Sequence, residues 1–288
     1  FSFGKSRLLS RKQVLQKLPG INAKNLAGGI EYFDGQFDDA RLAINLAQTA
    51  AQRGGVVLNY IKVKGLQKNG EKVTGVTATD METGKEYALS GKAIINATGV
   101  FVDDVLRMDA PNSKPLVRPS QGVHIVLDKK FLPAESALMI PETADGRVLF
   151  AVPWHNHVVI GTTDTPLNEH SLEPVALQQE VDFIMATLRQ YVNIKPEEKD
   201  VLSVFAGLRP LAAPQKDTDS TKEISRDHKL IVSPSGLITI TGGKWTTYRK
   251  MGEETVNKAI EVAHLQPSSC STKNVSIHGC APRGTDYL

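Results

Sequence analysis

The stretch that decides the fold is Thr239-Ile240-Thr241-Gly242-Gly243-Lys244-Trp245-Thr246-Thr247-Tyr248-Arg249, near the end of the chain. Its β-branched start predicts a strand, and the residues from Lys244 to Ile260 predict a helix. The two adjacent glycines let the backbone turn and let a ligand approach it closely. The N–H groups at the start of such a helix, together with Lys244, are suited to bind an anion. Taken alone, the stretch is better explained as a glycine turn followed by a helix that its threonines cap.

The composition is that of a soluble globular protein with one large or two ordinary domains. Of the 288 residues, 41% are hydrophobic and 23% are charged. A net charge of +3, with no basic run, argues against nucleic acid as a partner. Cys270 and Cys280 form no disulfide framework and have no metal-ligand spacing around them, so we predict no metal site.

The two ends of the sequence differ from those of a complete secreted or membrane-spanning protein. No apolar run reaches the roughly 18 residues needed to cross a bilayer. Residues 1–7 contain neither an initiator methionine nor the apolar segment of a signal peptide. We therefore expect the chain to be an internal or processed piece of a longer protein.

Helices alternate with strands over residues 10–108, as in the later part of an α/β dinucleotide fold. The hairpin turns within this region are marked by Asn and Gly, which tolerate the backbone angles of tight turns. The predicted elements are a helix at 10–19, a strand at 26–33, a helix at 40–53, a buried strand at 56–60, a meander of strands at 60–67, 72–80 and 86–90, a strand at 92–97 and a helical turn at 102–108.

Residues 115–205 have a different character, that of a mostly antiparallel sheet with one helix. This pattern predicts a second domain inserted into the first. The predicted elements are strands at 122–127, 137–140, 147–153 and 157–163, followed by a helix at 174–191. The chain then returns to the first domain through residues 201–211 and through strands at 230–232 and 237–241, the last of which leads into the stretch Thr239–Arg249.

A second small-residue turn follows the strand at 92–97, at Ala97-Thr98-Gly99. Ligands in open α/β sheets bind outside the carboxyl ends of the strands. Small residues at such an end would let a phosphate or ribose lie against the backbone. An ordinary strand-to-helix turn explains these residues equally well when they are considered alone.

Four further residues are candidates for chemistry. Arg209 lies among apolar residues and needs an anionic partner if it is buried. Arg226 precedes a strand, although a surface pair with Asp227 explains it more simply. His124 lies inside an apolar strand and, with an ordinary pKa near 6.5, is the best-tuned general base in the chain. Asp164, at the end of the strand at 157–163, is most simply a capping residue.

Known hydrolase and nucleotide-binding signatures are absent from the sequence. It contains no Gly-x-Ser-x-Gly, no His-Glu-x-x-His and no Walker lysine. It also lacks the Gly-x-Gly-x-x-Gly turn that opens a dinucleotide fold. The later parts of such a fold are thus present without its opening strand and phosphate turn.

The motifs together resemble the FAD-dependent glycerol-3-phosphate dehydrogenases, from about Ser6 to about Leu265. The combination of the Gly242–Arg249 stretch with the motifs around Arg209 and Arg226 is highly specific. The motifs occur in the family's order: Tyr32-Phe33-Asp34-Gly35-Gln36, Asp38–Arg41, Ile94–Gly99, Gly122–Val126, Gly161–Asp164, Phe205–Leu211, Ile224–Asp227 and Gly242–Arg249. The first and last of them look closer to the mitochondrial type than to the bacterial one.

The resemblance implies an α+β / α/β fold in which a partial glutathione-reductase-like FAD domain carries an inserted antiparallel-sheet substrate domain. The FAD-binding domain is expected at 38–110 and 205–265, and the substrate domain at 1–37 and 111–204. Residues 266–288 are expected to be a tail or linker. Compared with the family, the N-terminal βαβ unit and the C-terminal helical domain are missing, so the chain resembles a central fragment.

The resemblance also implies an activity, namely flavin-dependent oxidation of sn-glycerol 3-phosphate to dihydroxyacetone phosphate, with electrons passed to quinone. Peripheral association with a membrane is implied for the full-length protein, the mitochondrial inner membrane more than the bacterial cytoplasmic membrane. The chain alone is expected to be inactive, because the missing strand carries the main FAD contacts.

Roles for individual residues follow from the same resemblance. Arg226 and Lys244 are expected to bind the substrate phosphate through charge-assisted hydrogen bonds. Arg209 is expected to hold the C2 oxygen, and His124 to accept the hydroxyl proton. The residues expected to lie against FAD are Ala97, Thr98, Gly99, Gly242, Gly243, Lys244, Thr246 and Thr247.

Two alternatives remain open from the sequence. A related amine- or hydroxy-acid-oxidising flavoprotein would hold a carboxylate, for which one arginine is usually enough, whereas two arginines and a lysine favour phosphate. The chain could instead be an inert structural fragment without bound FAD. Flavin absorbance in the purified chain separates cofactor binding from the inert alternative.

Overall fold

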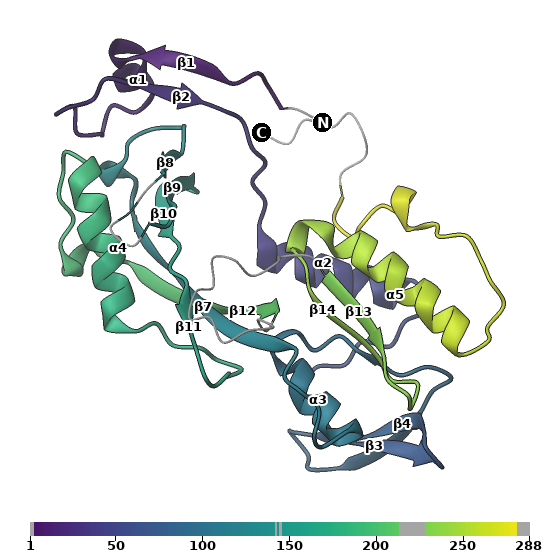
Figure 1. Cartoon of the computed structure of the whole chain (residues 1–288). Helices are drawn as coiled ribbons and strands as arrows, with labels where there is room; N and C mark the ends of the chain where they lie inside the picture. The colour runs from purple at the N-terminus through teal and green to yellow at the C-terminus, as the bar shows by residue number, and fades with distance from the viewer. Residues whose placement is uncertain (1–2, 142, 144–145, 213–227, 281–288) are drawn as a thin grey trace. The chain divides into compact units, whose positions relative to one another are not determined.

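A computed structural model describes residues 3–141, 143, 146–212 and 228–280 (Figure 1). The chain divides into two compact units. Unit 1 comprises Phe1–Gly35 and Arg118–Ile224, and unit 2 comprises Gln36–Val117 and Ser225–Leu288. Each unit is therefore assembled from two separate segments of the chain.

The main sheet of unit 1 is six-stranded and is built around the long strand β7 (Val117–Asp128). β7 pairs in antiparallel fashion with β10 (His157–Gly161) and β11 (Thr165–Pro166), and it also pairs with β12 (Ser203–Ala212). The sheet continues from β10 to β9 (Leu149–Trp154) and β8 (Leu138–Ile140). The predicted antiparallel sheet is thus confirmed.

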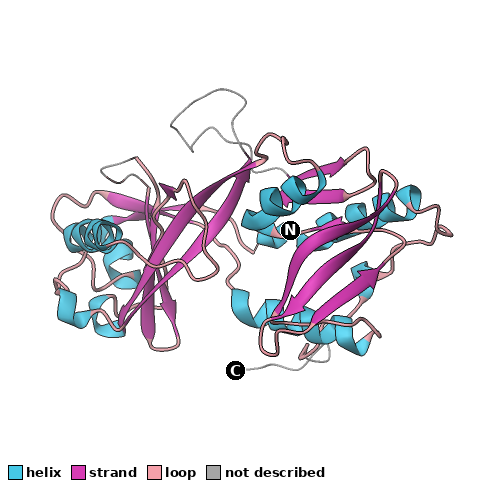
Figure 2. Cartoon of the chain, turned by 90° about the horizontal axis from the view of Figure 1, so that it is seen from below, coloured by secondary structure: helices cyan, strands magenta, loops and turns pink. Residues whose placement is uncertain are grey.

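The core of unit 1 follows from the alternating pattern of β7. Val123, Ile125 and Leu127 point to one face of the strand and are fully buried. That face is covered by α4 (Gln178–Tyr191), whose residues Ile184 and Leu188 join the same apolar cluster. The helix lies beside the strands of the sheet in Figures 1 and 2. α4 therefore packs against β7, the strand that carries His124.

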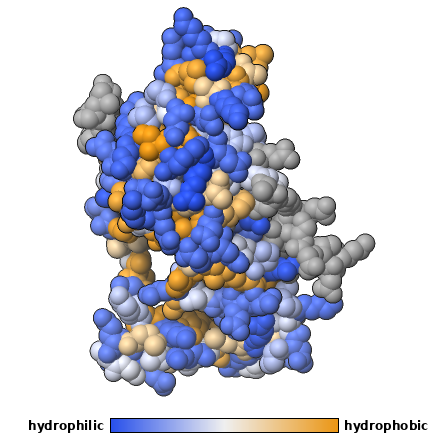
Figure 3. Space-filling model, turned by 90° about the vertical axis from the view of Figure 1, so that its left-hand side faces the viewer, coloured by the Kyte–Doolittle hydropathy of each residue, from blue (hydrophilic) through white to orange (hydrophobic). Residues whose placement is uncertain are grey.

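A small two-stranded sheet completes unit 1. β1 (Arg7–Ser10) pairs with β2 (Gly28–Glu31), and α1 (Arg11–Lys17) lies between them in sequence. The Ser10 hydroxyl accepts a hydrogen bond from the N–H of Gln13 and caps this helix. Leu8 and Ile30 of these strands are exposed. Figure 3 shows apolar patches interrupting a largely hydrophilic surface on the face that it presents.

Unit 2 contains a three-stranded sheet in the order β13 (His228–Val232), β14 (Ile238–Gly242) and β6 (Ile95–Asn96). β14 runs antiparallel to β13 and parallel to β6. The helix predicted from Lys244 to Ile260 begins as a 3-10 turn, Trp245–Thr247. It continues as α5 (Tyr248–Val262), which lies along β14 (Figure 1).

The remaining elements of unit 2 match the predicted alternation. α2 (Asp39–Gln52) is capped by the Asp38 side chain, which accepts a hydrogen bond from the N–H of Arg41. α3 (Val102–Asp109) follows β6 through the 3-10 turn Gly99–Phe101. The predicted meander is present as the antiparallel strands β3 (Ile61–Asn69), β4 (Lys72–Asp80) and β5 (Glu86–Ser90).

The predicted buried strand at residues 56–60 is wrong. Val56, Val57 and Leu58 are exposed and have no strand partner among the residues that the structure describes. A β-strand depends on a neighbour for its ladder of hydrogen bonds, and apolar composition alone does not supply one. The strand predicted at 92–97 is likewise reduced to its two paired residues, 95–96.

The two units differ from the expected domains at the short segments 36–37 and 111–117, which belong to unit 2, and at two longer segments. β12 pairs with β7 and belongs to unit 1, although its residues from 205 onward are expected in the FAD-binding domain. The expected tail at 266–288 is grouped with unit 2, and its described part contacts two helices. His278 donates its backbone N–H to the Thr49 hydroxyl of α2 at 2.8 Å, and Thr272 contacts Arg249 of α5.

No helix in the described part of the chain combines the length and apolar character needed to cross a bilayer.

Candidate functional site

The residues singled out in the sequence fall into two groups, one in each unit. His124 and Arg209 lie on neighbouring strands, β7 and β12, of unit 1. The glycine turns at 97–99 and 242–247 lie in unit 2. Arg226, together with the motif at 224–227, lies outside the described residues, so its role stays a prediction.

Two glycines make room for the unit 1 group. A Cβ atom on Gly122 would lie 2.3 Å from Nη2 of Arg209. A Cβ atom on Gly161, which pairs with His124 across β10 and β7, would lie 2.2 Å from Cδ2 of that histidine. Both distances are shorter than any van der Waals contact, so these side chains take their places only because no side chain stands there.

The guanidinium of Arg209 is held by the segment that follows β10. Nη1 donates to the carbonyl oxygen of Thr163 at 3.1 Å, and Nη2 donates to the hydroxyl of Thr162 at 2.9 Å. Oδ1 of Asp164 lies 3.8 Å from Nη1 and also accepts a hydrogen bond from the Ser120 hydroxyl. Arg209 therefore has the anionic neighbour that its apolar sequence context predicts. Its side chain nevertheless remains 34% exposed.

His124 is half-buried, with its ring stacked on that of Phe205 at a centroid distance of 5.0 Å and an interplanar angle of 10°. The pKa of His124 is lowered from its ordinary value of 6.5, mainly by burial and to a smaller extent by the positive charge of Arg209. The imidazole is therefore neutral at pH 7 and able to accept a proton. A neutral base beside a fixed cation can take a proton from a hydroxyl while the cation stabilises the oxygen left behind.

Replacing Gly122 with alanine is expected to displace Arg209 and to lower kcat about 10- to 100-fold for any reaction in which the guanidinium takes part. The guanidinium is the mobile end of a long side chain, so it moves before the backbone does, and the thermal unfolding temperature should change little. Steady-state kinetics and a thermal melt measure the two quantities.

Gly207→Ala is the matched control for this change. Gly207 lies on β12 two residues before Arg209, and no atom lies within 4 Å of the place where its Cβ would stand. The control should retain the wild-type kcat. An unchanged kcat in Gly122→Ala would show that the position of Arg209 does not matter for the reaction.

The unit 2 group is formed by two turns at one edge of the sheet. β6 and β14 are parallel neighbours, with Ile238 opposite Ile95 and Thr239 opposite Asn96. Their carboxyl ends therefore lie side by side and bring Ala97-Thr98-Gly99 next to Gly242-Gly243. Gly99, Gly242 and Gly243 have φ values of 61°, 73° and 78°, which glycine adopts without strain. The sheet topology thus unites two turns that are about 140 residues apart in the sequence.

Hydrogen bonds of small polar side chains shape these turns. Thr247 Oγ1 accepts from the N–H of Lys244 at 3.3 Å and donates to its carbonyl oxygen at 2.9 Å. Thr98 Oγ1 donates to Oδ1 of the buried Asn96, whose Nδ2 donates to the carbonyl oxygen of Val102. The side chains of Lys244 and Thr246 are exposed. Thr247 therefore closes the turn, and Lys244 and Thr246 remain accessible.

The unit 2 edge fits a cofactor that lies against backbone. Its glycines present N–H groups without covering side chains. The hydroxyls of Thr239 and Thr241 on β14 are buried and have no hydrogen-bond partner among the described residues. Buried hydroxyls ordinarily have a partner, and Thr241 immediately precedes the glycine pair.

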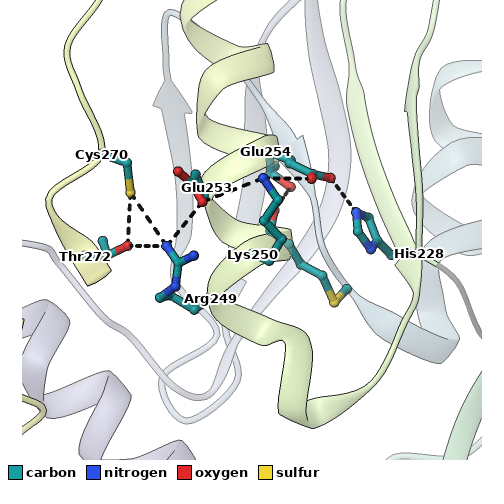
Figure 4. Close-up of polar contacts among 9 residues, drawn as sticks. His228, Arg249, Lys250, Glu253, Glu254, Cys270 and Thr272 are labelled. Atoms are coloured by element: carbon teal, nitrogen blue, oxygen red, sulfur yellow. Dashed lines mark hydrogen bonds and ion pairs between the residues drawn. The ribbon is translucent and has the colours of Figure 1, made fainter. Parts of the chain in front are cut away.

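Arg249, the last residue of the stretch Thr239–Arg249, makes contacts within the structure of unit 2. Arg249 of α5 contacts Glu253 at 3.2 Å and the Thr272 hydroxyl at 3.3 Å, and it points toward Cys270 (Figure 4). On the other side of the same helix, Glu254 binds Nε2 of His228 at 2.6 Å. These contacts tie β13 and the segment after α5 to the helix.

Sequence reasoning missed the buried residues to which Arg209 is connected through Thr163. Thr163, Glu180 and Gln121 are buried polar residues joined to one another by hydrogen bonds. The residues at 161–164 predict a polar turn and belong to the family's motifs but give no sign of a buried network, and Glu180 lies in an ordinary amphipathic helix. Its one signal is an acid three residues after the residue that caps the helix, Leu177, which is common in surface helices as well.

Comparison with known proteins places these observations in a family. A model of the FAD dependent oxidoreductase family matches residues 2–249. The chain is 40% identical to the mitochondrial glycerol-3-phosphate dehydrogenase of Mesocricetus auratus and 39% identical to that of Homo sapiens, over 282 residues each. These alignments cover 95% of the chain but only 38% of each relative.

Comparison with solved structures finds the same family. The glycerol-3-phosphate dehydrogenase from Bacillus halodurans, solved in complex with FAD, is 35% identical and superposes with a TM-score of 0.80, covering 92% of this chain and 51% of that one. Glycine oxidase from Bacillus cereus superposes with a TM-score of 0.65 at 18% identity, covering 91% of this chain and 65% of that one. The second likeness shows the fold alone.

Proposed function

Because the chain belongs to the family of FAD-dependent oxidoreductases, we propose that the whole protein oxidises sn-glycerol 3-phosphate to dihydroxyacetone phosphate with FAD as its cofactor. The observation that carries the proposal is the cluster of His124 and Arg209 on neighbouring strands. A neutral base beside a fixed cation suits the oxidation of a secondary alcohol. The 40% identity to a glycerol-3-phosphate dehydrogenase over 95% of the chain supports this choice of alcohol.

The proposed function needs two sets of residues, one that binds the cofactor and one that acts on the substrate. FAD would be held by the unit 2 residues Ala97, Thr98, Gly99, Gly242, Gly243, Lys244, Thr246 and Thr247. Unit 1 would supply the residues that act on the substrate carbon. FAD, when bound, accepts the hydride from C2 of the substrate.

The residues of unit 1 handle the hydroxyl group at C2. Arg209 donates hydrogen bonds to the C2 oxygen, and its charge stabilises the alkoxide character that develops on that oxygen. His124 accepts the hydroxyl proton on its neutral ring. Asp164, 3.8 Å from Arg209, offsets part of the charge of the guanidinium. The result is a site that favours loss of the proton without carrying a large net charge.

Phosphate recognition is assigned to Arg226 and Lys244. A phosphate dianion needs more than one fixed cation, whereas a carboxylate is commonly held by a single arginine. The exposed Lys244 at the end of β14 is accessible to an anion. This set of cations favours a phosphate ester over the amino acid or hydroxy acid that the alternative flavoprotein class would oxidise.

The electron acceptor and location are proposed from the same resemblance. We assign quinone as the acceptor and a peripheral position at the mitochondrial inner membrane for the full-length protein. The mitochondrial names of the relatives support the compartment.

A substrate comparison in the full-length protein tests the proposed function. Glycerol 3-phosphate should reduce the enzyme, whereas glycerol, glycine and lactate at the same concentration should not. Arg226→Ala and Lys244→Ala should each raise KM for glycerol 3-phosphate about 10- to 100-fold, the loss of one or two charge-assisted hydrogen bonds. The control Lys273→Ala removes an exposed lysine near the end of the described chain and should leave KM unchanged. Equal KM values in wild type and Arg226→Ala would refute the phosphate role of Arg226.

A further inference from the structure

One acidic side chain of unit 1, Glu180, is almost completely buried, with 3% of its surface exposed. Its Oε1 accepts hydrogen bonds from the hydroxyls of Thr163 at 3.0 Å and Thr165 at 2.6 Å. Its Oε2 accepts from Nε2 of Gln121 at 2.7 Å and from the N–H of Leu177 at 2.9 Å. The four bonds use the full acceptor capacity of a carboxylate.

The hydrogen bonds keep this carboxyl group ionised despite its burial. Burial alone would raise the pKa of Glu180, but the hydrogen bonds from Thr165, Leu177, Gln121 and Thr163 together lower it below its ordinary value. A carboxylate only accepts hydrogen bonds, so all four donors must point toward it. The network therefore has one arrangement, which fixes the side chains that take part in it.

Thr163 connects this network to both candidate catalytic residues. Its hydroxyl donates to Glu180 and accepts the N–H of Val123, the residue before His124 on β7. Its carbonyl oxygen accepts the hydrogen bond from Nη1 of Arg209. A single residue thus joins the buried carboxylate to the strand that carries the base and to the guanidinium.

We propose that Glu180 is a positioning residue, which holds Thr163 and through it sets the position of Arg209 beside His124. The inference rests on the proposed function, because it concerns the residues assigned to the C2 hydroxyl. Glu180 itself does not touch the substrate. Its effect is on the geometry of the cation and the base, and a misplacement of about 1 Å at such residues can cost about a hundredfold in rate.

Two substitutions in the full-length enzyme test this role. Glu180→Gln keeps the shape but places an NH₂ group where an acceptor is needed. Thr163→Val keeps the shape but removes the hydroxyl, and Thr163→Ser restores it. Glu180→Gln and Thr163→Val should lower kcat per bound FAD about 10- to 100-fold with a smaller change in KM, and Thr163→Ser should stay close to wild type.

A second readout does not depend on turnover. If Arg209 leaves its place, its charge no longer opposes protonation of His124, so the pKa of His124 should rise in Thr163→Val and Glu180→Gln. Histidine ring NMR with ¹³C labelling of the full-length protein measures this rise. Asp182→Asn is the control, because Asp182 is an exposed acid on the same helix, α4.

The outcomes separate this inference from the proposed function. An unchanged kcat per FAD in Thr163→Val, or a loss of rate fully explained by loss of folded and FAD-loaded enzyme, overturns the positioning role. If Arg209→Ala is inactive while Glu180→Gln matches wild type, the proposed function survives and the inference fails. If Arg209→Ala itself retains wild-type activity, the proposed function fails first.

Discussion

Replacing Arg209 with alanine in the full-length enzyme is expected to lower kcat for glycerol 3-phosphate about 100- to 1,000-fold, the usual effect of removing a donor to a developing oxyanion. Arg209 reaches its position through two hydrogen bonds to the segment after β10 and through the space left by Gly122. Because these interactions fix the guanidinium before substrate binds, its donors need no reorganisation during the reaction. Steady-state kinetics normalised to FAD content measure the effect.

Lysine at this position tests whether charge alone is sufficient. Arg209→Lys keeps the charge but loses the planar fork that binds Thr162 and Thr163 at once, so it should recover only part of the lost rate. Arg107→Ala serves as a control, since Arg107 lies on the unit 2 helix α3, where it pairs with Asp104. A kcat for Arg209→Ala within about threefold of wild type, well below the loss expected for such a donor, would remove Arg209 from the reaction.

His124→Ala is expected to lower kcat about 100- to 10,000-fold, as for the loss of a general base. Because burial and Arg209 lower the pKa of His124, the acidic limb of the kcat/KM profile should lie below pH 6.5 in the wild type. The rate falls on that limb because protonation occupies the ring nitrogen that must accept the substrate proton. Removing the charge in Arg209→Gln should move the remaining limb to higher pH.

The control for His124 is His157→Ala, on the neighbouring strand β10. His157 is exposed and its Nδ1 is bonded to the carbonyl oxygen of His155, so its loss should leave both kcat and the pH profile unchanged. A His124→Ala enzyme that keeps the wild-type acidic limb would assign that limb to another group.

Much of the fold could be predicted because the informative patterns are local. Alternation along residues 123–127 identifies a strand with one buried face, and the turn residues between the strands of the meander identify its hairpins. The resemblance to a known family assigns the turns at 97–99 and 242–243 to one cofactor, but the local sequence does not show that they are neighbours. Only the parallel pairing of β6 with β14 shows that they share one edge.

The remaining features depend on partners far away in the sequence. Residues 56–58 have the composition of a buried strand but no neighbour to pair with, so they are exposed. β12 could not be assigned to unit 1 without knowing that it pairs with β7. Glu180 acquires its importance from Thr163, Thr165 and Gln121, which approach it only when β7 and β11 are paired.

The central claim is that His124 and Arg209 act directly on the alcohol whose electrons enter FAD. Anaerobic mixing of glycerol 3-phosphate with the FAD-loaded full-length enzyme, followed by the loss of flavin absorbance, tests it most directly. We predict rapid bleaching in the wild type, and slow bleaching at equal FAD content in both His124→Ala and Arg209→Ala. Bleaching at the wild-type rate in both variants would contradict the account.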